Sequence, residues 1–491
     1  MSSLKEKAIS GMMWNAVERF GSTFFLFLSN LVLARLLMPS DFGTVAMLMV
    51  FISISETIVE AGFSSALIQK KNVDELDYST VFLWNIFFSL LLYLLLYFTS
   101  PQISNFYRNE ELCFILRIQG LVLPLNSLVI IHIAKLKREL KFKLTAKINL
   151  LSVVVGTIAG VIAAFIGWGV WSLVLKMLVS SCIMVLLYYS IVKWVPNIRF
   201  DFERFSVMFR FGIWILLSRL VNTLFHNMMA LLIGKFMSAS TLGYYNQAKK
   251  LEDIPRSTLS SIVNNVAFPV FSKIQGDLQR FKINAKKCVR SLSFISTPLM
   301  ICAIAIARPL ILLLFTEKWL PVVEYFQLLC LGALALTPLE LNYEFINSLG
   351  FSKLSFNLRL IQRGIGVLLM FVGIVYGIYG LLLAYIFGQL LSFFIAGYIS
   401  GIRFGYGLFD QINDMLPSIV ISFLSLFVCY IESILLTFDG YIIQIVIRAA
   451  LFFGVYGLLS VMFCNEDIRI IKESIFKILK NKKVWKNIGH K

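Results

Sequence analysis

The residues of this chain that could bind a ligand or form ion pairs are the charged side chains inside long apolar segments. Arg19 and Arg219 stand out, because a shift of 200 residues places one on the other. A charge at the centre of a membrane helix costs roughly 2.5–3.5 kcal/mol, so each should face a water-filled cavity or an ion partner. Two guanidiniums facing one cavity would bind a phosphate-bearing anion with bidentate geometry. The open alternative is local pairing, of Arg19 with Glu56 or Glu60 and of Arg219 with an acidic residue of segment 241–271.

The polar segment 241–271 supplies further candidates. A helix this polar cannot face lipid around its whole circumference, so we expect it to line a cavity, where its hydroxyl and amide groups would suit sugars. The alternative for Lys249 and Lys250 is that one end of the segment protrudes into water. The candidate substrate-binding residues are therefore Arg19, Arg219, Arg256, Lys176, Glu60, Tyr244 and Asn246.

Motifs for catalysis, cofactors and metals are absent from the sequence. There is no G-x-x-x-x-G-K-[ST] phosphate loop and no H-E-x-x-H motif. The three histidines are dispersed, and the seven cysteines are scattered without a C-x-x-C pair, as expected for small buried apolar residues. The sequence predicts that the chain is not an enzyme, and it predicts neither a cofactor nor a metal site.

The elements that carry these residues are predicted to be membrane helices. The chain is 58% hydrophobic and 15% charged, whereas soluble domains are about 45–50% apolar and about 25% charged. A membrane-spanning helix needs about 20 apolar residues. We predict fourteen spans, at 12–35, 42–67, 79–99, 111–133, 147–167, 170–192, 207–234, 241–271, 289–315, 321–346, 355–378, 380–401, 414–436 and 441–463.

Basic residues alternate between the loops. Lys and Arg gather at the N-terminus, in the even-numbered loops and in the tail, whereas the odd-numbered loops hold only Arg35, Arg108, Lys235 and Lys318. The positive-inside rule then predicts that both termini are cytoplasmic. The net charge of +18 thus reflects membrane topology rather than a nucleic-acid partner.

An internal repeat organises the spans. At a shift of 200 residues, seven of the thirty positions from 14 to 43 are identical, namely Trp14, Arg19, Thr23, Phe25, Leu31, Ser40 and Gly43. Six spans separate the copies, so the repeats are parallel. We therefore expect an all-α membrane protein with two pseudo-symmetric six-helix lobes around a central cavity, followed by two C-terminal helices. The G-x-x-x-G pairs at Gly156 and Gly373 are expected to serve helix packing.

The predicted domains follow from this repeat. They are an N-terminal lobe at 1–193, a C-terminal lobe at 194–402, two further spans within 403–464, and a tail at 465–491. Isoleucines recur at helical spacing in the tail between basic residues, which is typical of an amphipathic helix on an anionic membrane surface. The alternative is a solvated tail.

Four stretches of sequence resemble one bacterial family. They are the run from Leu33 to Gly43 (LARLLMPSDFG), the run from Glu60 to Gln69 (EAGFSSALIQ), Leu242–Tyr245 (LGYY) and Phe268–Ser272 (FPVFS). The chain resembles bacterial polysaccharide flippases, in the subgroup of colanic-acid and teichuronic-acid exporters within the multidrug/oligosaccharidyl-lipid/polysaccharide exporter superfamily.

The resemblance implies fourteen spans, a cationic cavity matched loosely by Arg19 and Arg219, and alternating access in the bacterial inner membrane. Its implied cargo is an undecaprenyl-pyrophosphate-linked oligosaccharide carried from the cytoplasmic to the periplasmic leaflet, with polymerase or export proteins as further partners. An ion-coupled multidrug or small-molecule exporter is the alternative, and it would need acidic cavity groups such as Glu56, Glu60, Glu340 and Glu344. A membrane-embedded polymerase or scaffold is the third hypothesis.

Overall fold

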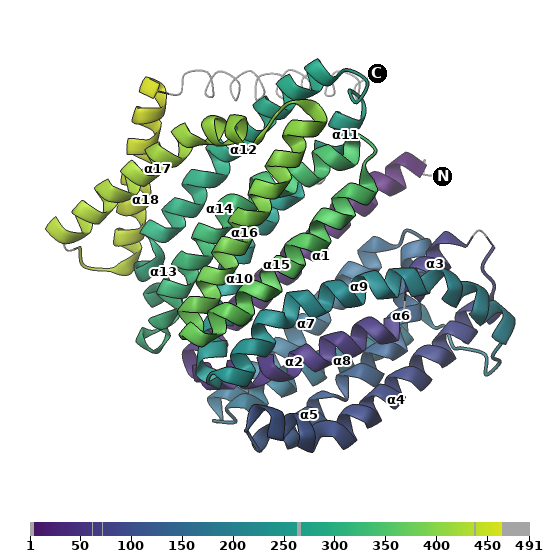
Figure 1. Cartoon of the computed structure of the whole chain (residues 1–491). Coiled ribbons are helices and arrows are strands. Elements are labelled where there is room, and N and C mark those ends of the chain that lie inside the picture. Colours follow the sequence, from purple (N-terminus) through teal and green to yellow (C-terminus); the bar gives the residue numbers. More distant parts are fainter. Residues whose placement is uncertain (1–3, 61, 71, 263–266, 437, 464–491) are drawn as a thin grey trace, which may run out of the picture. The chain divides into compact units, whose positions relative to one another are not determined.

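Helices make up the regular secondary structure of the part of the chain that the structure describes. In the computed structural model these residues are 4–60, 62–70, 72–262, 267–436 and 438–463 (Figure 1). Side chains are described over the same ranges except at 4–13, 15–20 and 258–262. The predicted amphipathic tail at 465–491 lies outside these residues.

The chain divides into two compact units, with the division between Asn246 and Gln247. The first unit contains α1 (Leu4–Leu36), α2 (Pro39–Glu60), α3 (Phe63–Gln69), α4 (Glu75–Tyr107), α5 (Glu111–Gln119), α6 (Val122–Arg138), α7 (Phe142–Phe165), α8 (Val170–Val192) and α9 (Phe202–Phe236). The boundary falls within α10 (Ala239–Ile262). The second unit contains α11 (Phe268–Ser272), α12 (Leu278–Ala305), α13 (Ala307–Leu314), η2 (Glu317–Trp319), α14 (Pro321–Ser348), α15 (Ser352–Gly373), η3 (Ile374–Tyr376), α16 (Gly377–Phe404), α17 (Leu408–Leu435) and α18 (Tyr441–Phe463).

This boundary comes later in the chain than the repeat-based one at 193/194. The reason is that α9 packs on α2, α3 and α4, within the first unit. The assignment of α9 to a C-terminal six-helix lobe therefore stays a prediction based on the repeat.

Within the residues that the structure describes, each of the fourteen predicted spans overlaps one or more helices. Eleven helical segments in the described part are long and apolar enough to cross a membrane, and one of them, Ser352–Phe404, contains both α15 and α16. The two remaining predicted spans correspond to α1, whose apolar part is the shorter stretch Gly21–Leu36, and to the polar α10. The expected all-helical membrane fold is confirmed.

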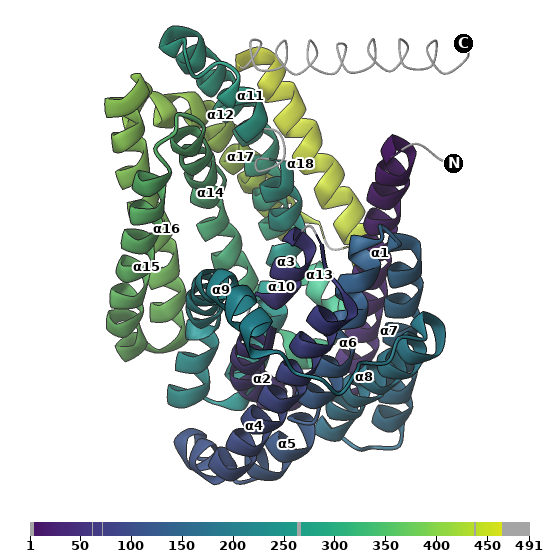
Figure 2. The ribbon, with the colours of Figure 1, turned by 90° about the vertical axis from the view of Figure 1, so that its right-hand side faces the viewer.

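Glycines permit close helix contacts in both units. A methyl group on Gly156 of α7 would lie 2.7 Å from the carbonyl oxygen of Lys176 on α8, and one on Gly160 would lie 2.7 Å from the Cβ of Lys176. In the second unit, Figure 2 shows α15 and α16 side by side, and a methyl on Gly373 would lie 2.4 Å from the carbonyl oxygen of Gly380. Gly377 instead occupies the turn between them, with φ 71°.

Buried aromatic and amide side chains hold the second unit together. The rings of Phe281, Phe345 and Phe404 contact one another at centroid distances of 5.0–6.0 Å across α12, α14 and α16. Asn342 donates to Gln411 at 2.8 Å, and Ser400 donates to Asn342 at 2.6 Å. These buried polar groups satisfy one another, which fixes the register of three helices.

The closest backbone approach in the first unit joins the starts of α2 and α10. A methyl group on Gly43 would lie 1.7 Å from the carbonyl oxygen of Ala239, and one on Gly243 would lie 2.0 Å from the carbonyl oxygen of Pro39. These four positions are equivalent in pairs under the 200-residue repeat, so each helix start makes the same contact on the other. The contact is thus locally two-fold, and only glycine fits at either position.

The Gly43–Gly243 crossing generates a stability prediction. Gly43→Ala should lower thermal stability in detergent by an amount corresponding to about 1–3 kcal/mol, because two backbones must move apart. The control is Gly454→Ala on α18, where no neighbour lies within 4 Å. The Gly43→Ala/Gly243→Ala pair should cost less than the sum of the single changes, since one separation relieves both clashes. Equal stability of the Gly43 and Gly454 variants would contradict this.

Candidate functional site

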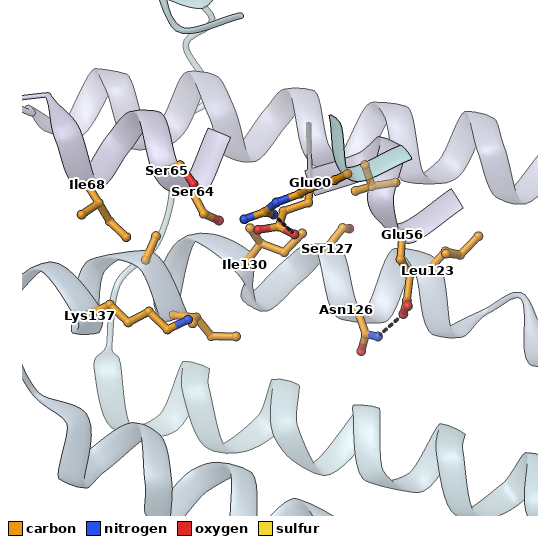
Figure 3. A pocket seen from close by; sticks show the side chains of 14 residues that line it. Glu56, Glu60, Ser64, Ser65, Ile68, Leu123, Asn126, Ser127, Ile130 and Lys137 are labelled. Carbon is orange, nitrogen blue, oxygen red and sulfur yellow. Dashed lines mark hydrogen bonds and ion pairs between the residues drawn. The ribbon is translucent and has the colours of Figure 1, made fainter. Parts of the chain in front are cut away.

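Four helices of the first unit surround a cavity of about 400 Å³. Its lining residues come from α2, α3, α6 and α9, and they are Glu56, Val59, Glu60, Ser64, Ser65, Ile68, Leu123, Asn126, Ser127, Ile130, Ile133, Ala134, Lys137 and Arg219. Figure 3 shows Glu56 and Asn126 at one end, Lys137 with Ile68 at the other, and Glu60 between. A polar lining on apolar helices is expected only where water or a polar ligand enters.

A helix break shapes this cavity. Gly62, between α2 and α3, has φ 72°, a left-handed conformation that favours glycine. A methyl group at Gly62 would also lie 2.8 Å from the carbonyl oxygen of Gly212 on α9. At the break the chain changes direction, so that α3 packs against α9. The serines of α3 then lie at the cavity wall.

A charge cluster fixes the start of α9, the helix that carries Arg219. Arg204 contacts Asp77 at 3.3 Å and Asp201 at 3.2 Å, and it also bonds Asp74, the N-cap of α4. The buried carboxylate of Asp77 also accepts a hydrogen bond from Lys70, at 2.6 Å, in a second ion pair. The hydrogen bond from Arg204 lowers the pKa of Asp74 below its usual value. The cluster thus ties α9 to α4 and to the residue after α3.

Arg219 forms an ion pair with Glu60 at the middle of the cavity. Its Nη1 lies 2.7 Å from Oε2 of Glu60, and the two side chains are 42% and 37% exposed. The pairing partner is therefore a carboxylate of α2 rather than one from segment 241–271. Partly exposed ion pairs are weak, so a stronger anion could compete for the guanidinium.

Glu56 has a different environment one helical turn away. Asn126 donates to its Oε1 at 2.9 Å, and Ser181 donates to the amide oxygen of Asn126 at 2.9 Å. Within the described part of the chain no ion pair is formed by Glu56. The three side chains form a hydrogen-bonded row from α2 through α6 to α8.

The charges of the cavity balance. Glu56 and Glu60 face Arg219 and Lys137, and the side chain of Lys137 forms neither a hydrogen bond nor an ion pair with another described residue. Hydroxyl groups from Ser64, Ser65 and Ser127 complete the polar wall. Among the described residues no cluster of three His, Cys, Asp or Glu side chains could hold a metal ion. The arrangement can bind a ligand that combines an anionic group with hydroxyls.

The other sequence-predicted residues lie elsewhere. Lys176 donates to Ser29 at 2.7 Å, and Arg256 pairs on its own helix with Glu252, at 3.2 Å, and with Asp253. Tyr244 and Asn246, also on α10, are half-buried and outside the lining of this cavity. The side chain of Arg19 lies outside the described residues. Of the candidate residues whose side chains the structure describes, only Glu60 and Arg219 meet at one cavity.

Sequence reasoning missed Asn126 and Lys137 as lining residues. Asn126 and Ser127 form a polar pair within the apolar segment 111–133, and this pair was the available signal. Lys137 lies in the last turn of α6, but the sequence placed it in a basic loop after the predicted span 111–133, where membrane topology already accounted for its charge.

Comparison with known proteins identifies the family. The profile of the polysaccharide biosynthesis protein family matches residues 32–324, which is more than half of the chain. The chain therefore belongs to this family of multi-pass membrane proteins.

Curated relatives are similar over about two thirds of the chain or more. The teichuronic acid biosynthesis protein TuaB of Bacillus subtilis is 28% identical, with 72% of this chain and 74% of TuaB covered. The lipopolysaccharide biosynthesis protein WzxC of Escherichia coli is 27% identical, with 68% of each chain covered. The succinoglycan biosynthesis transport protein ExoT of Rhizobium meliloti is 25% identical, with 69% of this chain and 68% of ExoT covered.

Solved structures show the same fold at low identity. The lipid II flippase MurJ, in an inward closed conformation, superposes with a TM-score of 0.74 at 18% identity, covering 93% of this chain and 100% of MurJ. An inward-facing multidrug resistance transporter of the MATE family gives a TM-score of 0.56 at 14% identity, covering 78% of this chain and 94% of that transporter.

The Glu56–Asn126 hydrogen bond gives a testable coupling. Asn126→Ala should lower stability by about 1.5–3 kcal/mol, because it removes a donor from a carboxylate. The same change in a Glu56→Ala background should cost less, and the difference is measured by a double-mutant cycle of thermal melts. Equal costs in both backgrounds would show that the two side chains are not coupled.

Proposed function

We propose that this protein is a flippase that moves an undecaprenyl-pyrophosphate-linked oligosaccharide from the cytoplasmic to the outer leaflet by alternating access. It would act as a transporter, with no chemical step on its cargo. The observation that carries the proposal is the polar cavity of the first unit, in which apolar membrane helices enclose an exchangeable Arg219–Glu60 pair. Membership of the polysaccharide biosynthesis family, and the names of relatives such as WzxC and the flippase MurJ, support it.

The cavity chemistry matches the two polar parts of such a cargo. A pyrophosphate carries more charge than the Glu60 carboxylate, so it would compete for Arg219 and accept bidentate hydrogen bonds from it. Lys137 would add a second cation, and Asn126 with the serines would bond sugar hydroxyls. Arg19, at the repeat-equivalent position, is proposed as a further cation for the same cargo. When the cargo leaves, Glu60 would pair with Arg219 again.

The exchangeable pair predicts opposite effects for its two members. Arg219→Gln should abolish surface polysaccharide in a complementation assay at normal protein level, and Arg19→Ala should do the same, because each removes a phosphate-binding cation. Glu60→Gln should retain complementation, because it removes only the competing anion. Arg280→Gln, on an exposed cation of α12, is the matched control. Full complementation by Arg219→Gln would refute the anion-binding role.

An ion-coupled multidrug or small-molecule exporter is the second candidate. It is favoured by Glu56, a cavity carboxylate with no cation partner in the described part of the chain, and by the fold shared with the MATE transporter. Drug resistance on expression, without a polysaccharide defect on deletion, would support this candidate over the first. Polysaccharide polymerase or export proteins are proposed as partners only for the flippase.

The proposed direction of transport requires a defined orientation. We propose a bacterial inner-membrane location with both termini cytoplasmic, from the distribution of Lys and Arg, and contact of the basic regions with anionic lipids. In a cysteine-free background, an impermeant maleimide should label Glu110→Cys in intact spheroplasts and Arg199→Cys only after permeabilisation. Both positions are exposed loop residues. The reverse labelling pattern would overturn this orientation.

A further inference from the structure

The second unit contains a helix break within the predicted span 289–315. The predicted span 289–315 is formed by two helices, because α12 ends at Ala305 and α13 begins at Ala307. Pro309 follows within the first turn of α13, and its missing N–H cannot bond the carbonyl of Ala305. Gln327 of α14 donates to the carbonyl of Ile304 at 3.3 Å. Irregular backbone inside a membrane is tolerated where it is covered by protein or lines a cavity.

A cavity of about 520 Å³ lies beside this break. It is lined by residues of α12, α13, α14, α17 and α18, all within the second unit. The polar side chains in its wall are Arg308, Gln327, Tyr430, Ser433 and Arg448. It belongs to a different unit from the cavity that holds Arg219, and it shares no residue with that cavity.

Two arginines give this cavity an excess of positive charge. Arg448 uses its Nε to bond Glu432 at 3.1 Å, and its two terminal amino groups bond no other described residue. Arg308 is exposed and forms no hydrogen bond or ion pair with the described part of the chain. One carboxylate therefore balances only one of the two guanidiniums. Each arginine retains the paired donors that fit a phosphate.

Part of the cavity wall is an apolar stripe on α17. Phe423, Leu426, Phe427 and Tyr430 follow the i, i+3, i+4, i+7 spacing of one helix face. Phe423 is 42% exposed and Phe427 is 59% exposed, so the stripe is open on its outer side. Such a wall suits a hydrocarbon chain, whereas a sugar would require more amide and hydroxyl groups than Gln327 and Ser433 supply.

We propose that this cavity binds an anionic glycerophospholipid, with its phosphate between Arg308 and Arg448 and an acyl chain along Phe423 and Phe427. The N-terminal end of α13 adds a favourable dipole for the phosphate. Because the site combines cations with an apolar wall, it selects an anionic amphiphile over a zwitterionic lipid or a free anion. Under the proposed orientation, α17 ends and α18 begins at the outer leaflet, which supplies this lipid.

Lipid binding to the purified full chain tests the site without any transport measurement. Native mass spectrometry in detergent would compare phosphatidylglycerol with phosphatidylcholine of identical acyl chains and with inorganic phosphate. The wild-type protein should retain phosphatidylglycerol preferentially. Arg308→Gln should weaken that binding about tenfold, the loss of one charge-assisted hydrogen bond. Arg308 has no described partner, so its replacement should leave the fold intact.

The matched control is Arg280→Gln, which makes the same substitution on an exposed cation of α12 outside the cavity. It should bind phosphatidylglycerol as the wild type does. Three outcomes would overturn the proposal: unchanged binding by Arg308→Gln, an equal loss in both variants, or equal retention of phosphatidylcholine. Binding of inorganic phosphate as tight as that of phosphatidylglycerol would exclude a role for the apolar wall. Since the readout is lipid retention, failure here is distinct from failure of the flippase proposal.

Discussion

The contact between the starts of α2 and α10 is the constraint on which the first unit depends. Gly43 packs on the carbonyl of Ala239, and Gly243 packs on the carbonyl of Pro39. No other residue type permits this approach, because any Cβ would meet backbone rather than a movable side chain. From Gly43, α2 runs seventeen residues to Glu60, about 25 Å at 1.5 Å per residue. The glycine contact therefore fixes the start of α2, and the length of α2 then determines where the cavity carboxylates lie.

Breaks in helices create the two cavities. Gly62 separates α2 from α3 beside the Arg219–Glu60 pair, and Ile306 separates α12 from α13 beside Arg308. In both places an interrupted helix opens space that a continuous apolar helix would fill with side chains. Charged residues gather at these openings because a charge in contact with lipid is costly. The two cavities thus both lie beside a helix break.

The two cavities differ in their charge balance, which distinguishes the roles proposed for them. In the first unit Glu56 and Glu60 offset Arg219 and Lys137, so a bound anion must displace a carboxylate. Such a site can hold a cargo and release it. In the second unit Glu432 offsets only one of two arginines, and the walls are mostly aromatic and aliphatic. Such a site suits a resident amphiphile.

The sequence by itself determined the helical membrane fold, the approximate positions of the spans, and the repeat that pairs Gly43 with Gly243. These features depend on local hydropathy and on periodic spacing, which a single chain displays directly. It also singled out Arg219 and Glu60, because a charge in an apolar segment is costly unless it has an ion partner or faces water. Only the tertiary structure decided that these two bind each other and that Asn126 and Lys137 share their cavity. Those outcomes depend on which helix faces meet, and residues 70 to 160 positions apart in sequence carry no local signal of that meeting.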